Sequence, residues 1–293
     1  GNNLVNVMLQ GGIEVHRATA TFKVGNTEYP EGSYILYGAQ AFRPFLADLM
    51  ERQNYPDLFQ FPGGPPIPPY DLTGWTLPMQ MGIKVDRITT SFTATAQKLD
   101  AKVPVIAGSI KGTAGFGYAI QRKDNASAKA INRLQKAGEK LHVATAAFTD
   151  GGTNYPAGTF LVEKGSKTQN NLSKITQETG VTASAISAKP SASKAMLKVK
   201  VGLYKSWVDN IDEGWTRWVL EQFEFDLDTL HDTDLRTKNL SLYSAIVLPS
   251  QRGEELMHGN RKGEMPDQFT GGMGLVAACD MAVSVDTAHY CLS

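Results

Sequence analysis

The sequence predicts an α/β protein: two copies of a small α-β-β-α unit followed by the first half of a doubly wound domain. Two observations lead to this fold class. Residues 16–36 recur at 142–162 without a gap, and ten of the twenty-one positions are identical. From Lys198 onward, strand and helix patterns alternate, which is typical of a parallel sheet with helices between its strands.

The first copy has the order helix, strand, strand, helix. Apolar residues within 4–8 predict a short helix that ends at Gly11-Gly12. Residues 14–23 and 33–37 are rich in β-branched and aromatic side chains, as strands are, and turn residues separate them. Apolar residues at helical spacing in 42–49 predict the closing helix.

The second copy repeats this order. Asn125 is expected to cap a helix that ends at Gly138. A strand pair is predicted within 140–163, joined by a hairpin turn at Asp150-Gly151-Gly152. A helix at 171–178 closes the unit.

Two segments are predicted to be connectors. Residues 61–70 contain five prolines and two glycines, which favours a stiff polyproline-type connector; the alternative is a docking ligand for another domain. Residues 184–194 are rich in Ser, Ala and Lys. The glycines of 111–117 suggest a phosphate loop, but a strand pattern follows instead of a helix, so hairpin glycines are favoured.

The third part contains the alternating elements. Apolar runs at 199–204, 225–230 and 245–249 predict strands. Asn210 to Glu213 resembles a capping box that opens a helix, whose Trp215 and Trp218 we expect in the core. Asp232 is expected to cap a short helix.

Ligands of an open α/β sheet bind beyond the carboxyl ends of its strands. Polar and aromatic residues gather in the segments predicted to follow the first and third strands. We therefore expect a pocket in which an arginine binds the carboxylate of a ligand; the alternative is a domain interface. The candidate ligand-binding residues are Trp207, Asn210, Arg217, Gln251, His258 and Arg261.

Histidines are the natural candidates for metal ligands. His16 and His142 occupy equivalent positions in the two copies, where a paired-ligand site competes with structural histidines bonded to backbone. His231-x-x-Asp234 is interpreted as helix capping within an acidic run.

Several longer blocks resemble one family: residues 11–18, 63–71, 74–78, 201–207 and 212–221. They look like the region downstream of the catalytic domain in large exported bacterial zinc carboxypeptidases of the carboxypeptidase A type. The resemblance covers about residues 1–272 and includes the start of a domain similar to class I glutamine amidotransferases.

The resemblance does not carry an active site over. Zinc hydrolysis in this family needs a His-x-x-Glu pair, and none of the five histidines here has Glu at that position. Cys279 lacks the glycine neighbours of an amidotransferase nucleophile. We therefore expect no catalytic residue, metal ligand or cofactor here, although whether the chain is an enzyme stays open. The resemblance implies zinc in the upstream catalytic domain of the parent.

Composition narrows the function classes. Lys+Arg and Asp+Glu are 29 each in 293 residues, which disfavours nucleic-acid binding. No apolar run approaches the roughly 20 residues of a membrane span. The start at Gly1 and two cysteines near the end lead us to expect a piece of a longer secreted or periplasmic protein.

The expected function is that of a non-catalytic accessory or scaffold part of a zinc carboxypeptidase-like protein, with the upstream peptidase domain and peptide substrate as partners. The alternative is a small-ligand or protein-binding module of amidotransferase-like (flavodoxin-like) fold. We hypothesise that a frameshift altered the tail. The predicted parts are 1–60 (first unit), 61–105 (connector and buried linker), 106–195 (second unit), 196–274 (start of the amidotransferase-like domain) and 275–293 (doubtful tail).

Overall fold

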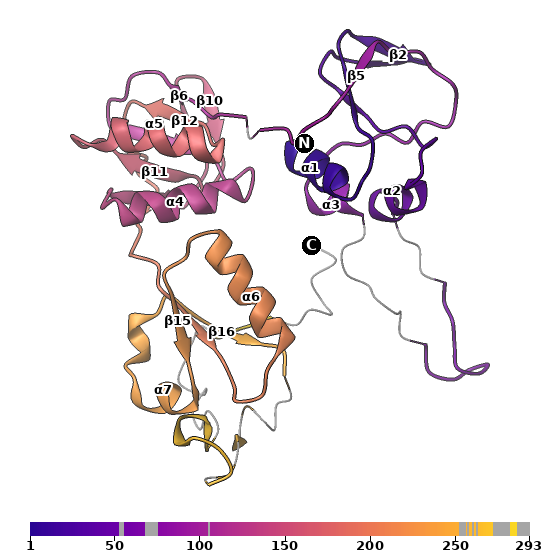
Figure 1. Ribbon diagram of the computed structural model, residues 1–293. Coiled ribbons are helices and arrows are strands. Elements are labelled where there is room, and N and C mark those ends of the chain that lie inside the picture. The colour runs from indigo at the N-terminus through magenta and orange to yellow at the C-terminus, as the bar shows by residue number, and fades with distance from the viewer. Residues whose placement is uncertain are drawn as a thin grey trace. The chain divides into compact units, whose positions relative to one another are not determined.

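The computed structural model describes residues 1–52, 56–67, 76–104, 106–251, 256, 258, 259, 261, 263–271 and 282–285. Within these ranges it is a mixed α/β protein with several sheets and seven α-helices (Figure 1). The chain divides into two compact units, residues 1–106 and 107–293, each of which is considered by itself below. Trp75, Cys279 and most of the predicted tail lie outside the described residues.

The first unit is built on helix α1 (Asn2–Gln10) and a three-stranded antiparallel sheet. The sheet has the order β4 (Tyr34–Ile35), β1 (His16–Ala18), β5 (Ala96–Lys98). The predicted strand 14–23 is interrupted after Ala18, and β2 (Phe22–Val24) and β3 (Thr27–Tyr29) form a separate hairpin. Helices α2 (Arg43–Met50) and α3 (Leu77–Gln80) complete the unit. Its core includes Leu4, Val5, Met8, Ile13, Val15 and Leu46.

The prediction of a stiff connector at 61–70 was wrong for the described part, residues 61–67. The amide of Gly64 donates to the carbonyl of Phe61 (2.9 Å), and Gly63 has φ of 77°. This is the geometry of a turn with proline second and glycine third. The amide of Ile67 donates to Leu58 (2.8 Å), so the segment folds back as a small hairpin instead of extending. Its large apolar side chains, Leu58, Phe59, Phe61 and Ile67, are exposed.

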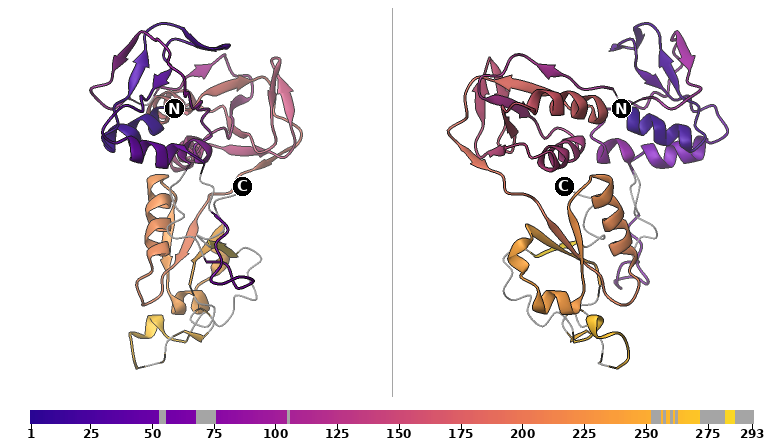
Figure 2. Two further views of the ribbon diagram at one scale, coloured as in Figure 1. Left: turned by 90° about the vertical axis from the view of Figure 1, so that its right-hand side faces the viewer. Right: turned by 60° about the vertical axis from the view of Figure 1, so that its left-hand side comes forward.

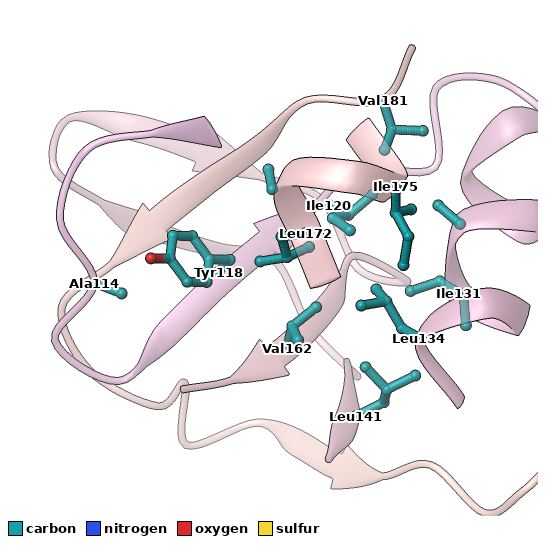
Figure 3. Close-up of a cluster of buried hydrophobic side chains, with 12 residues drawn as sticks. Ala114, Tyr118, Ile120, Ile131, Leu134, Leu141, Val162, Leu172, Ile175 and Val181 are labelled. Atoms are coloured by element: carbon teal, nitrogen blue, oxygen red, sulfur yellow. The ribbon is translucent and has the colours of Figure 1, made fainter. Parts of the chain in front are cut away.

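The second unit begins with a six-stranded sheet covered on one face by two helices. Helix α4 (Ala126–Lys136) and helix α5 (Thr168–Thr179) lie against each other and share one apolar core with the sheet. Figure 3 shows Ile131 and Leu134 of α4 and Leu172 and Ile175 of α5 beside apolar side chains of the strands. The strand order is β13 (Ser193–Ala195), β8 (Leu141–Ala144), β11 (Phe160–Glu163), β7 (Gly117–Ile120), β12 (Ala183–Ile186), β6 (Ile110–Lys111).

Two local predictions in this sheet were wrong. Strands β6 and β7 do not pair with each other, because β6 pairs in parallel with β12 and the glycine segment between them crosses over to β7. The loop is therefore not a hairpin. Residues 184–194 are not a plain connector either, since they contain most of β12 and the first residues of β13. The predicted hairpin turn is confirmed: β9 (Phe148–Asp150) and β10 (Thr153–Tyr155) enclose Gly151 and Gly152, both at positive φ.

Strand pairings in the two units share the offset of 126 positions. His16 pairs with Ile35 between β1 and β4, and His142 pairs with Leu161 between β8 and β11. The Phe22–Tyr29 ring stack has a centroid distance of 5.0 Å, and the corresponding Phe148–Tyr155 stack has 4.9 Å. The identical residues of the sequence therefore hold the same local geometry in both places.

The second unit continues into a parallel four-stranded sheet. Its order is β15 (Leu227–Leu230), β14 (Val201–Tyr204), β16 (Ala245–Pro249), β17 (Ala282–Val285). Helix α6 (Ile211–Gln222) runs along one side of this sheet, and α7 (Asp232–Thr237) lies on the other side (Figure 2). The core between the sheet and α7 includes Tyr204, Leu230, Leu235, Tyr243, Ile246 and Leu248. Tyr243 directly follows the short 3-10 helix η1 (Leu240–Leu242).

Two predictions for this part need correction. Asp232 is not the capping residue of α7, because His231 occupies that position in extended conformation and Asp232 is already helical. Trp215 and Trp218 are not in the core: 61% and 53% of these residues is exposed. The apolar period of α6 correctly marks one face of the helix, but the sheet packs against the opposite face.

Candidate functional site

The carboxyl ends of β14, β15 and β16 meet at one edge of the parallel sheet, where ligands of such sheets bind. His231, the first residue after β15, contacts the ring of Phe269 at a centroid distance of 4.5 Å. Trp207, three residues after β14, meets the same phenylalanine edge-on at 5.0 Å. Phe269 is buried, whereas Trp207 is half exposed. These three rings form an aromatic cluster at the predicted edge.

His231 is held in a defined tautomer. Its Nδ1 lies 2.8 Å from the carbonyl oxygen of Lys205, and because a carbonyl can only accept, Nδ1 must carry the hydrogen. In the neutral ring the lone pair then lies on Nε2. The capping interpretation is also confirmed, since the His231 amide donates to the Asp234 carboxylate at 3.0 Å. Sequence reasoning assigned His231 to capping alone, although its position directly after a strand was a signal for the edge.

Asn210 and Gln251 lie near the same edge. The Asn210 side chain caps α6 by accepting from the amide of Asp212 (2.8 Å), and its Nδ2 donates to the carbonyl of Ser250 (2.8 Å). Asn210 therefore fixes the start of α6 to the end of β16. The Nε2 atom of the neighbouring Gln251 is buried and has no hydrogen-bond partner among the described residues.

The structure does not assign Arg217 to ligand binding. Its Nε donates to Oε1 of Glu213 at 2.8 Å, and its Nη2 donates to the same oxygen. Glu213 is buried, so this ion pair lies between α6 and the sheet. His258 and Arg261 are exposed residues in a segment that is described only in part. Of the six candidates, the structure brings Trp207, Asn210 and Gln251 to the predicted edge.

A second surface was missed by the sequence analysis. Four large apolar residues of α6 lie at i, i+4, i+7 and i+8, which is one face of a helix. Their exposed fractions are 76% for Ile211, 61% for Trp215, 53% for Trp218 and 44% for Val219. The two indole rings meet edge-on at a centroid distance of 5.9 Å. We call these four residues the tryptophan face.

The surroundings of the tryptophan face are acidic. On a helical projection Asp212 borders one side of the face and Glu221 borders the other, and Asp209 lies just before the helix. Within the described ranges none of these three carboxylates has a cationic partner. Gly214 lies on the Glu221 side, and a Cβ atom built on it would meet nothing within 4 Å. Next to Trp218 the helix therefore has an open notch.

The two equivalent histidines have different partners. Nε2 of His142 lies 3.1 Å from the Glu163 carboxylate, whereas the His16 ring meets Tyr37 edge-on at 5.0 Å. Tyr37 and Glu163 are themselves 126 positions apart. Within the described residues neither ring shows the expected bond to backbone, and Nδ1 of each ring is buried without a partner there. The hydrogen bond from His142, with a further contribution from Lys140, lowers the pKa of the Glu163 carboxyl.

The first unit contains a groove of about 700 Å³ next to β1 and β5. Charges of both signs line it, including Arg17, Glu31, Lys98, Asp100 and Lys102. Lys98 already binds Glu14 at 2.8 Å. The remaining charges balance, so the groove does not select ligands of one charge.

No family model, no curated protein and no solved structure matched the chain. Among the described residues, no helix combines the length and apolar character needed to cross a membrane. In the same part of the chain no three His, Cys, Asp or Glu side chains gather where they could hold a metal ion.

Proposed function

We propose that this chain is a non-catalytic accessory region of an exported zinc carboxypeptidase-like protein, and that it acts by binding. In this proposal two copies of one α-β-β-α unit form the scaffold, and residues 196–274 form the start of an amidotransferase-like domain. Zinc belongs to the upstream peptidase domain of the secreted or periplasmic parent. The matched strand pairings and ring stacks at an offset of 126 positions support the duplicated scaffold.

The observation that carries a binding role is the tryptophan face. Fully burying a large apolar side chain contributes about 1.5–3 kcal/mol, so covering the exposed parts of these four would contribute on the order of 5 kcal/mol. Tryptophan is also enriched among the residues that dominate binding energy at protein interfaces. A contiguous apolar face of this kind, with polar residues along its border, marks an interaction site.

The border residues favour a basic amphipathic helix as the partner. Cationic side chains of such a helix would meet Asp212 and Glu221, while its apolar side chains would cover the tryptophan face. A second copy of α6 is disfavoured, because the carboxylates that border the face are acidic on both of its sides, so two copies would place like charges along the shared border. The notch at Gly214 lets a partner side chain approach the helix backbone.

Titration of the chain with two synthetic helical peptides tests the binding role. One peptide carries Leu on one face and Lys on its borders, and the other replaces every Lys by Glu. We expect the Lys peptide to change the tryptophan fluorescence and to bind more tightly than the Glu peptide. Trp218→Ala should weaken binding at least tenfold, whereas Leu242→Ala, an exposed apolar position elsewhere, should not. Equal binding of both peptides would contradict the assigned partner.

Gly214→Ala separates docking from folding. Replacing a helical glycine by alanine stabilises the free chain by about 0.5–1 kcal/mol, because the new methyl group meets no neighbour. The same methyl group fills the notch and should weaken binding of the Lys peptide several-fold. Unchanged affinity in this variant would place the contact away from Gly214.

The absence of catalysis is a separate part of the proposal. The purified 293-residue chain, supplied with zinc, should leave peptide substrates uncut. Turnover that a single substitution in this chain abolishes would overturn it. The outcome is independent of the peptide titration.

A small-ligand module is the second candidate, and the aromatic cluster at the sheet edge favours it. Trp207 offers a half-exposed ring, and Nε2 of His231 carries a lone pair that can accept a hydrogen bond. A thermal-shift screen of small carboxylic acids and amides tests this function. His231→Gln should abolish any shift that depends on the edge, whereas Trp218→Ala should leave it unchanged.

A further inference from the structure

Strand β11, inside the six-stranded sheet, has a neighbour that its counterpart in the first unit lacks. β11 pairs with β8 on one side and with β7 on the other. The corresponding strand of the first unit, β4, pairs with β1 in the matching register. On its other side no strand is present within the described residues. In the described part of the chain, one edge of β4 is therefore unpaired, whereas the equivalent edge of β11 is filled.

The direction of the free hydrogen-bonding groups follows from the ladder. The Ala18 amide donates to the Ser33 carbonyl at 2.8 Å, so these two residues lie at a hydrogen-bonding position of the ladder, although the Ser33 amide itself donates to Pro30. In an antiparallel ladder such pairs recur every second residue, so the amide of Ile35 also points toward β1. The amides of Tyr34 and Leu36 then point away from β1, toward the free edge.

The second unit shows which strand fills this position. β7 runs antiparallel to β11, with Ile120 opposite Phe160 and Tyr118 opposite Val162. Helix α4 starts at Ala126, so β7 leads directly into it. A Cβ atom on Gly117 would lie 2.0 Å from the carbonyl oxygen of Val162, and therefore only glycine fits at this end of β7.

The start of α1 lies beside the free edge. The Tyr34 hydroxyl donates to Oδ1 of Asn2 at 3.1 Å, and a Cβ atom on Gly1 would lie 4.0 Å from the Tyr34 ring. In the second unit the equivalent Phe160 and the first residue of α4 belong to one apolar cluster. Any polypeptide that led into α1 would therefore pass next to β4.

We propose that the free edge of β4 accepts an antiparallel strand, and that this strand is the polypeptide leading into α1, as β7 leads into α4. The proposal rests on the duplicated scaffold proposed above. The strand needs two apolar residues opposite Tyr34 and Leu36 and a glycine at its start. Pairing of β4 with β4 of a second copy is disfavoured, because two strands of two residues offer too few hydrogen bonds to hold two separate chains together.

The chain itself supplies the probe. We would copy residues 115–126 in front of Gly1 and follow amide hydrogen exchange by NMR in the full chain. Exchange at Tyr34 and Leu36 should slow at least about tenfold, whereas Ile35 should change little. A matched control changes Tyr118 and Ile120 of the copied segment to proline, which removes the two amides that face β11 in the original strand.

Three results would overturn the strand-acceptor proposal. The first is no slowing with the added segment, and the second is equal slowing with the proline control. The third is slow exchange at Tyr34 and Leu36 in the unextended chain together with dimers in sedimentation, which would assign the edge to a second copy. None of these outcomes bears on peptide binding at the tryptophan face, so the two proposals fail separately.

Discussion

The equivalent core positions Met8 and Leu134 allow the two units to be tested against each other. Both residues are 0% exposed, and they are 126 positions apart. Leu134 lies in the core that α4 and α5 form with the sheet (Figure 3). Truncating a buried leucine to alanine costs 2–5 kcal/mol, and complete burial between two helices and a sheet puts Leu134→Ala at about 3–4 kcal/mol. We expect a similar or slightly smaller loss for Met8→Ala.

Differential scanning calorimetry and urea denaturation measure these losses. A loss of 3–4 kcal/mol lowers the melting temperature of the second unit, residues 107–293, by about 10 °C, and the same loss shifts the smaller first unit further. Because the two residues belong to separate compact units, each variant should shift one transition and leave the other in place. A loss below about 1 kcal/mol for Leu134→Ala would contradict the packing. Both transitions shifting together would contradict independent units.

Three further predictions concern the second unit. Burial, followed by the bond to Asp228, raises the pKa of Tyr243 to about 12, so ultraviolet titration should show a late ionisation that Tyr243→Phe removes. The stabilising contribution of Tyr243 is complete below about pH 10 and is lost as pH rises toward that pKa. The guanidinium of Arg133 lowers the pKa of the Glu224 carboxyl. Arg133→Gln should therefore lower the free energy of unfolding by about 1–3 kcal/mol at neutral pH, as measured by urea denaturation. The difference from wild type should fade as pH drops below the ordinary carboxyl pKa and through the lowered one. Gly117→Ala should cost about 1–3 kcal/mol or prevent folding, because its methyl group would collide with a backbone carbonyl; circular dichroism melting checks this, and wild-type stability would refute it.

Local patterns predicted the elements that local residues determine. The hairpin at Gly151-Gly152 formed as expected, because two consecutive residues at positive φ favour glycine. The cap at Asn210 formed because its side chain reaches the amides of the next turn. The hairpin at Pro62-Gly63 was missed although proline followed by glycine is a turn signal, since the high proline content suggested an extended chain.

Local patterns could not predict which strands pair over long sequence distances, or which part of the molecule covers an apolar helix face. The partner of β6 is β12, more than seventy residues away in sequence, and the glycines between β6 and β7 give no sign of it. The period of α6 marks Trp215 and Trp218 as one apolar face, but it does not say whether the sheet or another molecule covers that face. The same limit applies to the site: the edge residues Trp207 and Asn210 were found, whereas the tryptophan face was not.

Glu224 combines an unfavourable backbone conformation with a contact to a residue that is distant in sequence. It follows the end of α6 with φ of 59°, a left-handed conformation in which glycine is more comfortable than any residue with a side chain. Its carboxylate binds two guanidinium nitrogens of Arg133 in α4 and also the ammonium group of Lys129. A glycine here would relax the turn but remove these ion pairs. Replacing Glu224 by glycine, the residue most often found at this position after a helix, would therefore weaken the contact between the six-stranded and the parallel sheet.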